Sequence, residues 1–437
     1  MKACGFLSLL AILFLSVNNT LSSIRPKHDK VVACYVASWA SYRPTNGKFD
    51  IKDLRPELCT HLIYAFAGLN ATTWTIKSLD PYKDITNGNY KKITQLRQMY
   101  PELKVSLAIG GWNEGSENYS KLASSPASRN TFVNSVVTYL RQYDFTGFDL
   151  DWEFPAARGG SRYDKANFVS LVKELKEAFR GSNYQLTAAI SANQLTVDAA
   201  YDIPEISKYL DYIHVMAYDF HGTWDMKVLP NSPMISPDGL DVEDTISHLL
   251  HKGIPPNKLV LGLPMYGRTF ILTTKPSFPQ KSPMNQPCLQ QGFKGPYTGE
   301  KGFMGYNEIC EEIIRNPGNW TTGWDTESST PYTINDDHVI VYDNPISMKA
   351  KVEYAMKMKL AGVMIWSIDT DDFHGNCASL KDSFDQTDNT FPLMRSINVI
   401  LENSTTSTKP NKPGSNSSNQ ISLYQAILIL SLILVKM

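Results

Sequence analysis

Two hydrophobic periods alternate along the middle of the chain. Short apolar segments rich in β-branched and aromatic residues predict buried strands, and they read VVACYVASW, LCTHLIYAFAGL, LKVSLAIGGW, GFDLDWEF, QLTAAISA, YIHVMAYDF, KLVLGLPMYG and GVMIWSID. Between several of them, apolar residues fall on one helical stripe, as in Phe132, Val133, Val136, Val137 and Leu140, or Phe168, Leu171, Val172, Leu175 and Phe179. About eight strand–helix repeats predict an α/β fold, a (β/α)8 TIM barrel.

One long region before the last predicted strand breaks this rhythm. Residues 271–338 are rich in Gly, Pro, Thr and Asn. Because a structureless loop of that length is uncommon in a compact domain, we predict a small α+β insertion subdomain between strands 7 and 8 of a barrel spanning 23–400. A doubly wound open sheet is the main alternative. Its Gly-rich turn after the first strand is replaced here by SWASYRP.

The segment TGFDLDWEFP, residues 146–155, alternates acids with apolar residues. In a strand, residues i, i+2 and i+4 share a face. Asp149, Asp151 and Glu153 therefore point one way, roughly 6–7 Å apart along the strand. The apolar residues between them point the other way, toward the barrel helices. We expect the acids to face the barrel interior at the carboxyl end of the strand, where barrel enzymes keep their chemistry.

Three carboxylates in a confined, partly dry space cannot all stay ionised cheaply. Like-charge repulsion and desolvation raise the pKa of at least one of them, so the cluster holds a proton near neutral pH. A protonated carboxylic acid beside ionised ones is what a glycosidase needs to protonate a leaving oxygen. The alternatives are a solvated acidic face on an exposed edge strand and a divalent-metal site, since Asp-x-Asp-x-Glu supplies hard oxygen ligands.

Aromatic side chains at the ends of the other predicted strands favour a sugar-binding groove over a metal site. They are Tyr35, Trp39, Phe66, Trp112, Tyr218, Trp224, Tyr266 and Trp366. Several such flat apolar faces at the same ends of parallel strands suit the stacking of sugar rings. The histidines lack a metalloprotease spacing, and the sequence has no CxxC pair for a structural zinc site. We therefore expect no metal and no cofactor.

Charge and the two chain ends indicate a secreted protein rather than a nucleic-acid binder. Lys plus Arg is 42 and Asp plus Glu is 43, so the basic excess typical of nucleic-acid binders is missing. Residues 1–22 have the layout of a secretory signal peptide. A Ser/Thr/Pro/Asn-rich stalk, 401–420, precedes an apolar tail, 421–437, that is typical of a glycosylphosphatidylinositol (GPI) signal. A transmembrane helix is the alternative for the tail.

Secretion gives meaning to glycosylation triplets and to the cysteines. Candidate acceptors in Asn-x-Ser/Thr triplets are Asn70, Asn118, Asn319, Asn403 and Asn416. Removal of Cys4 with the signal peptide leaves an odd number of cysteines. An oxidising compartment should pair them where geometry permits, with one left over. We expect the protein outside the cell, either held at the surface by a lipid anchor or secreted.

Six motifs occur in order along residues 31–391: YVASWASYRP, SLAIGGWN, GFDLDWEFP, MAYDFHGTW, LPMYGRTF and GVMIWSIDTDDF. Together they resemble the family 18 glycoside hydrolases, specifically the animal-type chitinases. The resemblance implies hydrolysis of β-1,4-linked N-acetylglucosamine polymers with retention, in which the substrate's own 2-acetamido group replaces the usual nucleophilic carboxylate. It implies an endo-acting, monomeric enzyme whose substrate is chitin or a chito-oligosaccharide.

The resemblance also implies a role for each site residue. Glu153 would be the general acid and then the base. Asp151 would hold the acetamido N–H and stabilise the positively charged oxazoline-like intermediate, and Asp149 would share a proton with Asp151. Tyr218 would orient the acetamido oxygen, and Trp366 would form the floor of the central subsite. The other implied substrate-binding residues are Tyr35, Trp39, Phe66, Trp112, Asn113, Met216, Asp219, Trp224, Tyr266 and Arg268.

Cysteine positions and one substitution complete the resemblance. The implied disulfides are Cys34–Cys59 and Cys310–Cys377, which leave Cys288 over. The family usually begins the acidic motif with another Asp, and this chain has Thr146 there; we expect a structural role for it. Two other functions remain open: a catalytically weak glycan-binding lectin of the same fold, and an endo-β-N-acetylglucosaminidase acting on N-glycan cores.

Overall fold

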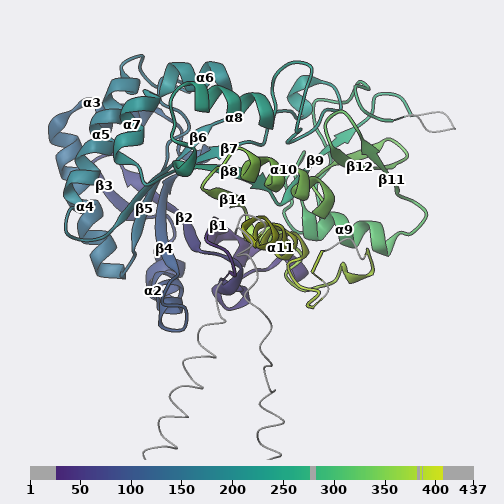
Figure 1. Ribbon diagram of the computed structural model, residues 1–437, viewed down its shortest axis with the longest axis horizontal. Helices are drawn as coiled ribbons and strands as arrows, with labels where there is room; N and C mark the ends of the chain where they lie inside the picture. Colours follow the sequence, from purple (N-terminus) through teal and green to yellow (C-terminus); the bar gives the residue numbers. More distant parts are fainter. Residues whose placement is uncertain (1–25, 276–281, 381–383, 386, 407–437) are drawn as a thin grey trace, which may run out of the picture.

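A closed parallel barrel forms the centre of the molecule (Figure 1). The computed structural model describes residues 26–275, 282–380, 384–385 and 387–406. Within them the barrel order is β1-β14-β8-β7-β6-β5-β4-β2, and pairing of β1 with β2 closes the ring. The strands are β1 (Val31–Ala37), β2 (His61–Asn70), β4 (Lys104–Gly110), β5 (Gly147–Asp151), β6 (Gln185–Ser191), β7 (Tyr212–Met216), β8 (Leu259–Pro264) and β14 (Gly362–Trp366). The predicted (β/α)8 barrel is confirmed.

Helices surround the barrel because each presents an apolar stripe to the strands. They are α2 (Asn89–Gln95), α3 (Glu117–Ser124), α4 (Pro126–Tyr143), α5 (Asp164–Ala178), α6 (Gln194–Ala200), α7 (Ile203–Tyr209), α8 (Val242–His251), α10 (Pro345–Lys357) and α11 (Pro392–Thr406). Helix α4 begins after Ser125, whose side chain accepts from the Ser128 amide at 3.3 Å. Its buried stripe includes Phe132, Val136 and Leu140, as the sequence predicts. A short strand, β3 (Thr75–Ser78), pairs antiparallel with β2.

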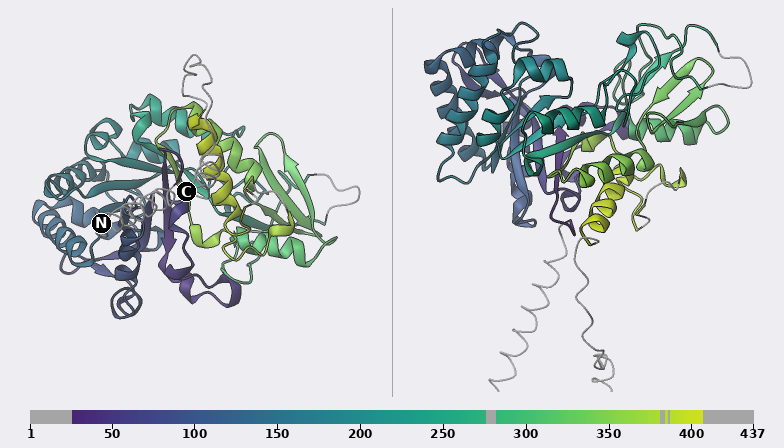
Figure 2. Two further views of the ribbon diagram at one scale, coloured as in Figure 1. Left: turned by 60° about the horizontal axis from the view of Figure 1, so that its bottom comes forward. Right: turned by 45° about the horizontal axis from the view of Figure 1, so that its top comes forward.

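The predicted α+β insertion lies between β8 and β14. Its antiparallel sheet has the order β10-β9-β13-β12-β11, formed by β9 (Tyr266–Ile271), β10 (Met304–Gly305), β11 (Thr321–Asp325), β12 (Thr330–Asn335) and β13 (His338–Val341), with helix α9 (Tyr306–Arg315). Phe270, Ile334 and Val339 belong to a small core of its own. Figures 1 and 2 show this green lobe to one side of the barrel. The sheet starts directly after β8, so it brings β9 residues to the barrel's carboxyl end.

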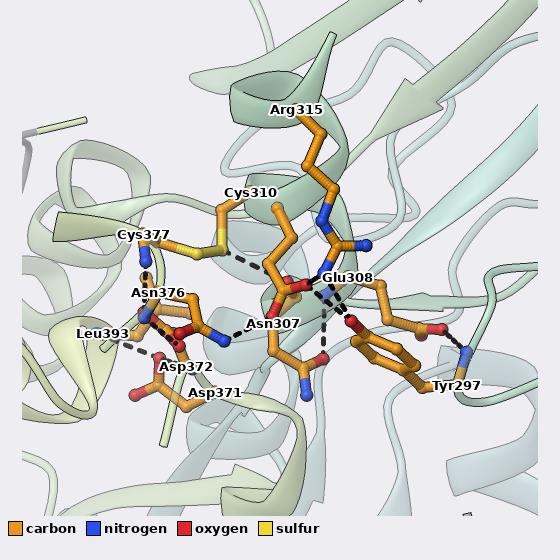
Figure 3. Close-up of a disulfide and its surroundings, with 11 residues drawn as sticks. Tyr297, Asn307, Glu308, Cys310, Arg315, Asp371, Asp372, Asn376, Cys377 and Leu393 are labelled. Atoms are coloured by element: carbon orange, nitrogen blue, oxygen red, sulfur yellow. Dashed lines mark hydrogen bonds and ion pairs between the residues drawn. A yellow bond between two sulfur atoms is a disulfide. The ribbon is translucent and has the colours of Figure 1, made fainter. Parts of the chain in front are cut away.

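Two disulfides join segments that are distant in sequence. Cys34 on β1 bonds to Cys59, which lies two residues before β2. Cys310 on α9 bonds to Cys377 (Figure 3), so the second bridge connects the insertion to the segment that follows β14. Both bridges are those that the family resemblance implies. Cys288 is buried with a free thiol in the core of the insertion.

Several sequence expectations concern the chain ends. The predicted signal peptide, the GPI signal and Asn416 lie outside the described residues. Among the described residues, no helix combines the length and apolarity that a membrane span requires. Asn118, Asn319 and Asn403 are exposed, and the Asn70 side chain accepts from the backbone amides of Thr72 and Thr73. Glycosylation at these positions stays a prediction.

Candidate active site

The acidic segment lies at the carboxyl end of β5. Asp149 and Asp151 belong to the strand and Glu153 lies just beyond it. Leu150 and Trp152, on the opposite face, are buried in the main core between strands and helices. The alternation predicted from the sequence is therefore present: one face of β5 packs against the helices, and the other places acids inside the barrel.

Asp149 is completely buried and held by groups from three other strands. The Tyr35 hydroxyl of β1 donates to its Oδ2 at 2.5 Å, and the Thr187 hydroxyl of β6 donates to its Oδ1. The Nδ1 atom of His214, on β7, lies 3.3 Å from Oδ1. Each carboxylate oxygen of Asp149 therefore accepts a hydroxyl hydrogen bond from another strand. Proton sharing between Asp149 and Asp151 remains a prediction.

Asp151 and Glu153 have fewer partners. Asp151 is buried, and its Oδ1 has no hydrogen-bond partner among the described residues. Burial, followed by repulsion from Glu153 and Asp149, raises the pKa of Asp151 well above its ordinary value. Burial raises the pKa of Glu153 to about 7; Arg158 opposes this rise and Asp219 adds to it. Glu153 is therefore able to give and take a proton near neutral pH.

Tyr218 lies beside the acids, just after β7. Its ring is buried, and its hydroxyl contacts the Met364 Sδ at 3.8 Å. Burial raises the Tyr218 pKa well above its ordinary value, so the hydroxyl keeps its proton. A thioether is a weak acceptor, and the hydroxyl can therefore donate more strongly to a substrate oxygen. Met216, the last residue of β7, is half-buried and packs against the same apolar cluster as Tyr218.

Asp219 connects the barrel to the insertion. Its Oδ1 accepts from the Tyr266 hydroxyl at 2.5 Å and forms an ion pair with Arg268 at 2.5 Å. Both partners lie on β9. The Tyr266 ring stacks on Phe303, with ring centroids 4.4 Å apart, and is almost fully buried. We conclude that Tyr266 presents its hydroxyl rather than an open ring face to the site.

Three aromatic rings from different strand ends form one contiguous apolar surface. The Phe66 ring lies 5.8 Å from Trp366 and 6.0 Å from Trp39, and both pairs are stacked. Trp39 is exposed and Trp366 is half-buried. Tyr35 differs from the sequence expectation that it stacks a sugar. It is 1% exposed and donates to Asp149, because its ring is enclosed between Trp366 and His214.

Two further tryptophans of the predicted site are exposed. Trp112 is 60% exposed and Trp224 is 53% exposed, which are large values for tryptophan side chains. Each carries a guanidinium over its ring, Arg158 at 3.5 Å from Trp112 and Arg268 at 5.1 Å from Trp224. Asn113, next to Trp112, is also exposed. The predicted site residues thus come from the barrel strands, from the segments that follow them, and from β9 of the insertion.

Thr146, where the family usually has Asp, connects two strands at the amino-terminal end of β5. Its Oγ1 accepts from the Val105 amide at 2.7 Å and donates to the Val105 carbonyl at 3.2 Å. The backbone carbonyl of Thr146 accepts from Gln185 on the next strand. The hydroxyl thus forms hydrogen bonds with both backbone groups of Val105, at the end of β5 opposite to Glu153. This agrees with the structural role expected from the sequence.

Sequence reasoning missed several residues that act on the acids. Thr187 donates to Asp149 and His214 lies beside it, and Asn231 accepts from the Asp219 amide at 3.0 Å through its Oδ1. Arg158 contacts the segment that carries Glu153. The period-2 pattern could have indicated Thr187 and His214, because both are polar positions within otherwise apolar strands. No comparable signal marks Arg158.

One group of potential metal ligands occurs among the described residues, and it lies away from the site. It comprises Cys310, Cys377 and Asp372. The two sulfur atoms are joined in a disulfide, so they do not provide the thiolates that a metal would need.

Comparisons with known proteins agree with this geometry. Residues 31–371 match the family described as glycosyl hydrolases family 18. "Probable chitinase 2" of Drosophila melanogaster is 47% identical over 396 residues, which cover 85% of this chain and 81% of the relative. The Ostrinia furnacalis Group IV chitinase, solved in complex with allosamidin, superposes with a TM-score of 0.81 at 41% identity, covering 86% of this chain and 100% of that one.

A second solved structure is similar over the same region. The second catalytic domain of the Ostrinia furnacalis Group II chitinase, a mutant in complex with penta-N-acetylchitooctaose, gives a TM-score of 0.79 at 36% identity and covers 86% of this chain and 97% of that one. The fold and the acidic strand define a barrel glycoside hydrolase. The chain belongs to glycosyl hydrolase family 18, and within it to the chitinase type.

Proposed function

We propose that the protein is an endo-acting chitinase that cleaves β-1,4-linked N-acetylglucosamine chains with retention, using the substrate's 2-acetamido group as the nucleophile. The observation that carries the proposal is the contrast within one strand. Each oxygen of Asp149 accepts a hydroxyl hydrogen bond, whereas Asp151 has an unpartnered buried oxygen and Glu153 has a pKa of about 7. Two carboxyl groups are thereby left available to the substrate.

The first chemical step requires an acid and a nucleophile. Protonated Glu153 would donate its proton to the glycosidic oxygen as that bond breaks. The acetamido oxygen would attack the anomeric carbon, oriented by the Tyr218 hydroxyl, whose present partner is only the Met364 thioether. The acetamido N–H would meet Asp151, and that contact would satisfy the oxygen that now lacks a partner. Formation of the oxazoline-like cation favours a negatively charged Asp151.

The second step reverses the role of Glu153. As a carboxylate it would remove a proton from water, which attacks the anomeric carbon from the side the leaving group vacated. The acetamido group is then regenerated and the product keeps the original configuration. The buried hydrogen bonds on Asp149 hold β5 in place during both steps, since Tyr35 and Thr187 come from other strands.

The substrate class is supported by the aromatic surface and by the relatives. Trp39, Phe66 and Trp366 offer a contiguous apolar cluster, and Trp112 and Trp224 add two exposed rings. The related insect domain that was solved with penta-N-acetylchitooctaose shares 36% identity with this chain. These features fit a polymer of flat N-acetylated sugars.

A hydrolysis assay on N-acetylglucosamine oligomers tests the proposal. Wild-type protein should shorten a hexamer at internal bonds, and Glu153→Gln should bind it with little turnover. Equal rates for the two proteins would disprove the role of Glu153. Binding without turnover by the wild type would support the lectin alternative. Release of glycans from an N-glycosylated protein, with no attack on chitin oligomers, would support the N-glycan-core alternative.

We also propose that the protein works outside the cell, held to the membrane by a GPI anchor. The support is the sequence pattern of residues 401–420 and 421–437. Phosphatidylinositol-specific phospholipase C should release the enzyme from cells. Resistance to the phospholipase, with residues 421–437 still detectable by mass spectrometry, would contradict the anchor.

We propose that the released enzyme is a monomer, because one chain supplies every group of the site. Light scattering measures the mass of the released enzyme directly.

A further inference from the structure

Arg158 occupies a position between the loops that follow β4 and β5. Its Nη1 donates to the backbone carbonyl of Glu153 at 2.9 Å, and its Nη2 donates to the backbone carbonyl of Trp112 at 2.9 Å. The guanidinium carbon lies 3.5 Å from the Trp112 ring centroid. One cation therefore contacts both the residue that carries the acid and an exposed tryptophan of the site.

Buried anchors fix the loop that carries Arg158. Asp164, which is completely buried, accepts from the Ala156 amide at 3.1 Å and from the Ser161 amide at 2.8 Å. Ser116 donates to the carbonyl of Phe154 at 2.7 Å. Arg158 itself has φ of 50°, in the left-handed region, which non-glycine residues rarely adopt. The loop is thus tied at several points, and its conformation directs Arg158 back toward the acid.

The contacts of Arg158 have the geometry of a clamp. A planar guanidinium donates in a fixed fork and stacks on aromatic faces, whereas an ammonium group does neither as well. Both acceptors are main-chain carbonyls, so the fork fixes backbone positions, not side-chain rotamers. A shift of the Glu153 backbone would move its carboxyl group from the glycosidic oxygen, and small displacements of a catalytic group cost rate steeply.

From this geometry we propose that Arg158 is a positioning residue, which sets the Glu153 backbone and the Trp112 platform relative to each other and supplies a nearby positive charge to the acid. The inference rests on the proposed function and adds a residue to it. Arg158 does not touch the reacting atoms. It acts through Glu153, on the side where Trp112 meets the sugar chain.

The charges around Glu153 define what removal of Arg158 should do. Asp151 and Asp149 lie on β5, and Asp219 follows β7, where Arg268 pairs with it. Tyr218 and Tyr201 also interact electrostatically with Glu153, and both keep their protons because burial raises their pKa values. Arg158 is the cation that lowers the pKa of Glu153. Without it, the carboxyl group should stay protonated to higher pH.

Two substitutions separate the positive charge of Arg158 from its paired hydrogen bonds to the Glu153 and Trp112 carbonyls. Arg158→Gln removes both the charge and the paired hydrogen bonds. Arg158→Lys keeps the charge and loses the paired donation and the stacking. We expect kcat to fall about tenfold in both variants, since neither keeps the paired donation to the two carbonyls. The alkaline limb of kcat/KM should move up by about half a pH unit in Arg158→Gln only, a small shift because the guanidinium is exposed. Arg162→Gln, which removes an exposed guanidinium of the same loop that stacks on Tyr163, is the matched control and should change neither.

Titration of Glu153 by NMR does not depend on turnover, so it tests this inference separately from the proposed function. NMR of protein labelled at glutamate Cδ, assigned with Glu153→Gln, reports the pKa of Glu153 in each variant. A higher pKa in Arg158→Gln than in the wild type supports the inference even if chitin proves not to be the substrate. An unchanged pKa and unchanged kcat in Arg158→Gln would overturn it, as would equal shifts in Arg158→Lys and Arg158→Gln. Melting temperatures close to that of the wild type exclude misfolding as the cause.

Discussion

Two groups of buried acids lie in this molecule, and they differ in how their oxygens are satisfied. Near the second disulfide, Glu308 accepts from the Thr298 and Gly305 amides. Asp372 accepts from the Asn376 and Cys377 amides (Figure 3). At the end of β5, Asp151 keeps a buried oxygen without a partner among the described residues. The carboxylates near the disulfide therefore hold loops together through hydrogen bonds to backbone amides, whereas Asp151 does not.

The comparison explains why burial alone does not identify a catalytic acid. Burial raises the pKa of Asp371, near the disulfide, to about 7, the same value as for Glu153. Asp371 nevertheless accepts from the amides of Asp372 and Met394, so its oxygens have no room for a substrate. An unpartnered buried oxygen distinguishes Asp151 from Asp371.

The largest expected effect on kcat comes from replacing one acid of the β5 group by its amide, and the matched test replaces one acid near the disulfide. Glu153→Gln should lower kcat by about 10²–10⁴-fold, since it removes the proton donor, with little change in melting temperature. Glu308→Gln should leave kcat of the folded enzyme unchanged and lower the free energy of unfolding by about 1–3 kcal/mol, because its amide nitrogen would face backbone donors. Steady-state kinetics and denaturant unfolding measure both. A loss of kcat in Glu308→Gln equal to that of Glu153→Gln would contradict the division.

Removal of the bridge between the insertion and the barrel tests the structural group further. The double variant Cys310→Ser, Cys377→Ser opens a link between residues 67 positions apart, which should lower the free energy of unfolding by about 3–5 kcal/mol. The kcat value at a temperature where the variant is folded should match the wild type. A large fall in kcat under those conditions would show that this region also shapes the site.

Asp151→Asn is expected to affect catalysis without a comparable loss of stability. The amide cannot carry the negative charge that steadies the cationic intermediate, so kcat should fall by about 10²–10³-fold. Stability should change little, because the Oδ1 atom has no partner to lose. Asp372→Asn is the matched control, and it should show the reverse: retained kcat and a lower melting temperature. Normal turnover by Asp151→Asn would remove Asp151 from the mechanism.

The pH profile gives the smallest effect. Hydrolysis needs protonated Glu153, whose raised pKa is about 7. The proton is therefore present below pH 7 and is lost as the pH rises through that value. The kcat/KM value should fall above about pH 7, by about tenfold for each further pH unit. An alkaline limb below pH 5, near the ordinary value for Glu, would contradict the raised pKa.

Much of the fold was predictable because its determinants are local in sequence. The period-2 and helical patterns indicate the barrel, and the acid–apolar alternation of residues 149–153 indicates both faces of β5. The sheet of the insertion runs from Tyr266 to Val341, wider than the 271–338 range expected, because β9 follows β8 directly and its apolar residues resemble an extension of that strand.

The rest depends on long-range packing that no local pattern encodes. Tyr35 looks like a surface stacking ring in sequence, but the closed barrel places its hydroxyl on Asp149. Arg158 looks like an ordinary loop charge, and it reaches Glu153 only because buried Asp164 fixes the loop. The Tyr35–Asp149 contact joins residues 114 positions apart, which meet only when the barrel closes. The Arg158–Glu153 contact spans five positions of one loop, but the second acceptor of Arg158, the Trp112 carbonyl, is 46 positions away.

The central claim is that the β5 acids catalyse hydrolysis with retention of the anomeric configuration. The configuration of the first product tests this claim most directly. Proton NMR of a chito-oligosaccharide digest, recorded before mutarotation, distinguishes the two anomers at the new reducing end. Attack by the acetamido group followed by water predicts the β anomer first, with the α form appearing only on equilibration. An initial α anomer would show direct attack by water and would contradict the mechanism built on Asp151 and Glu153.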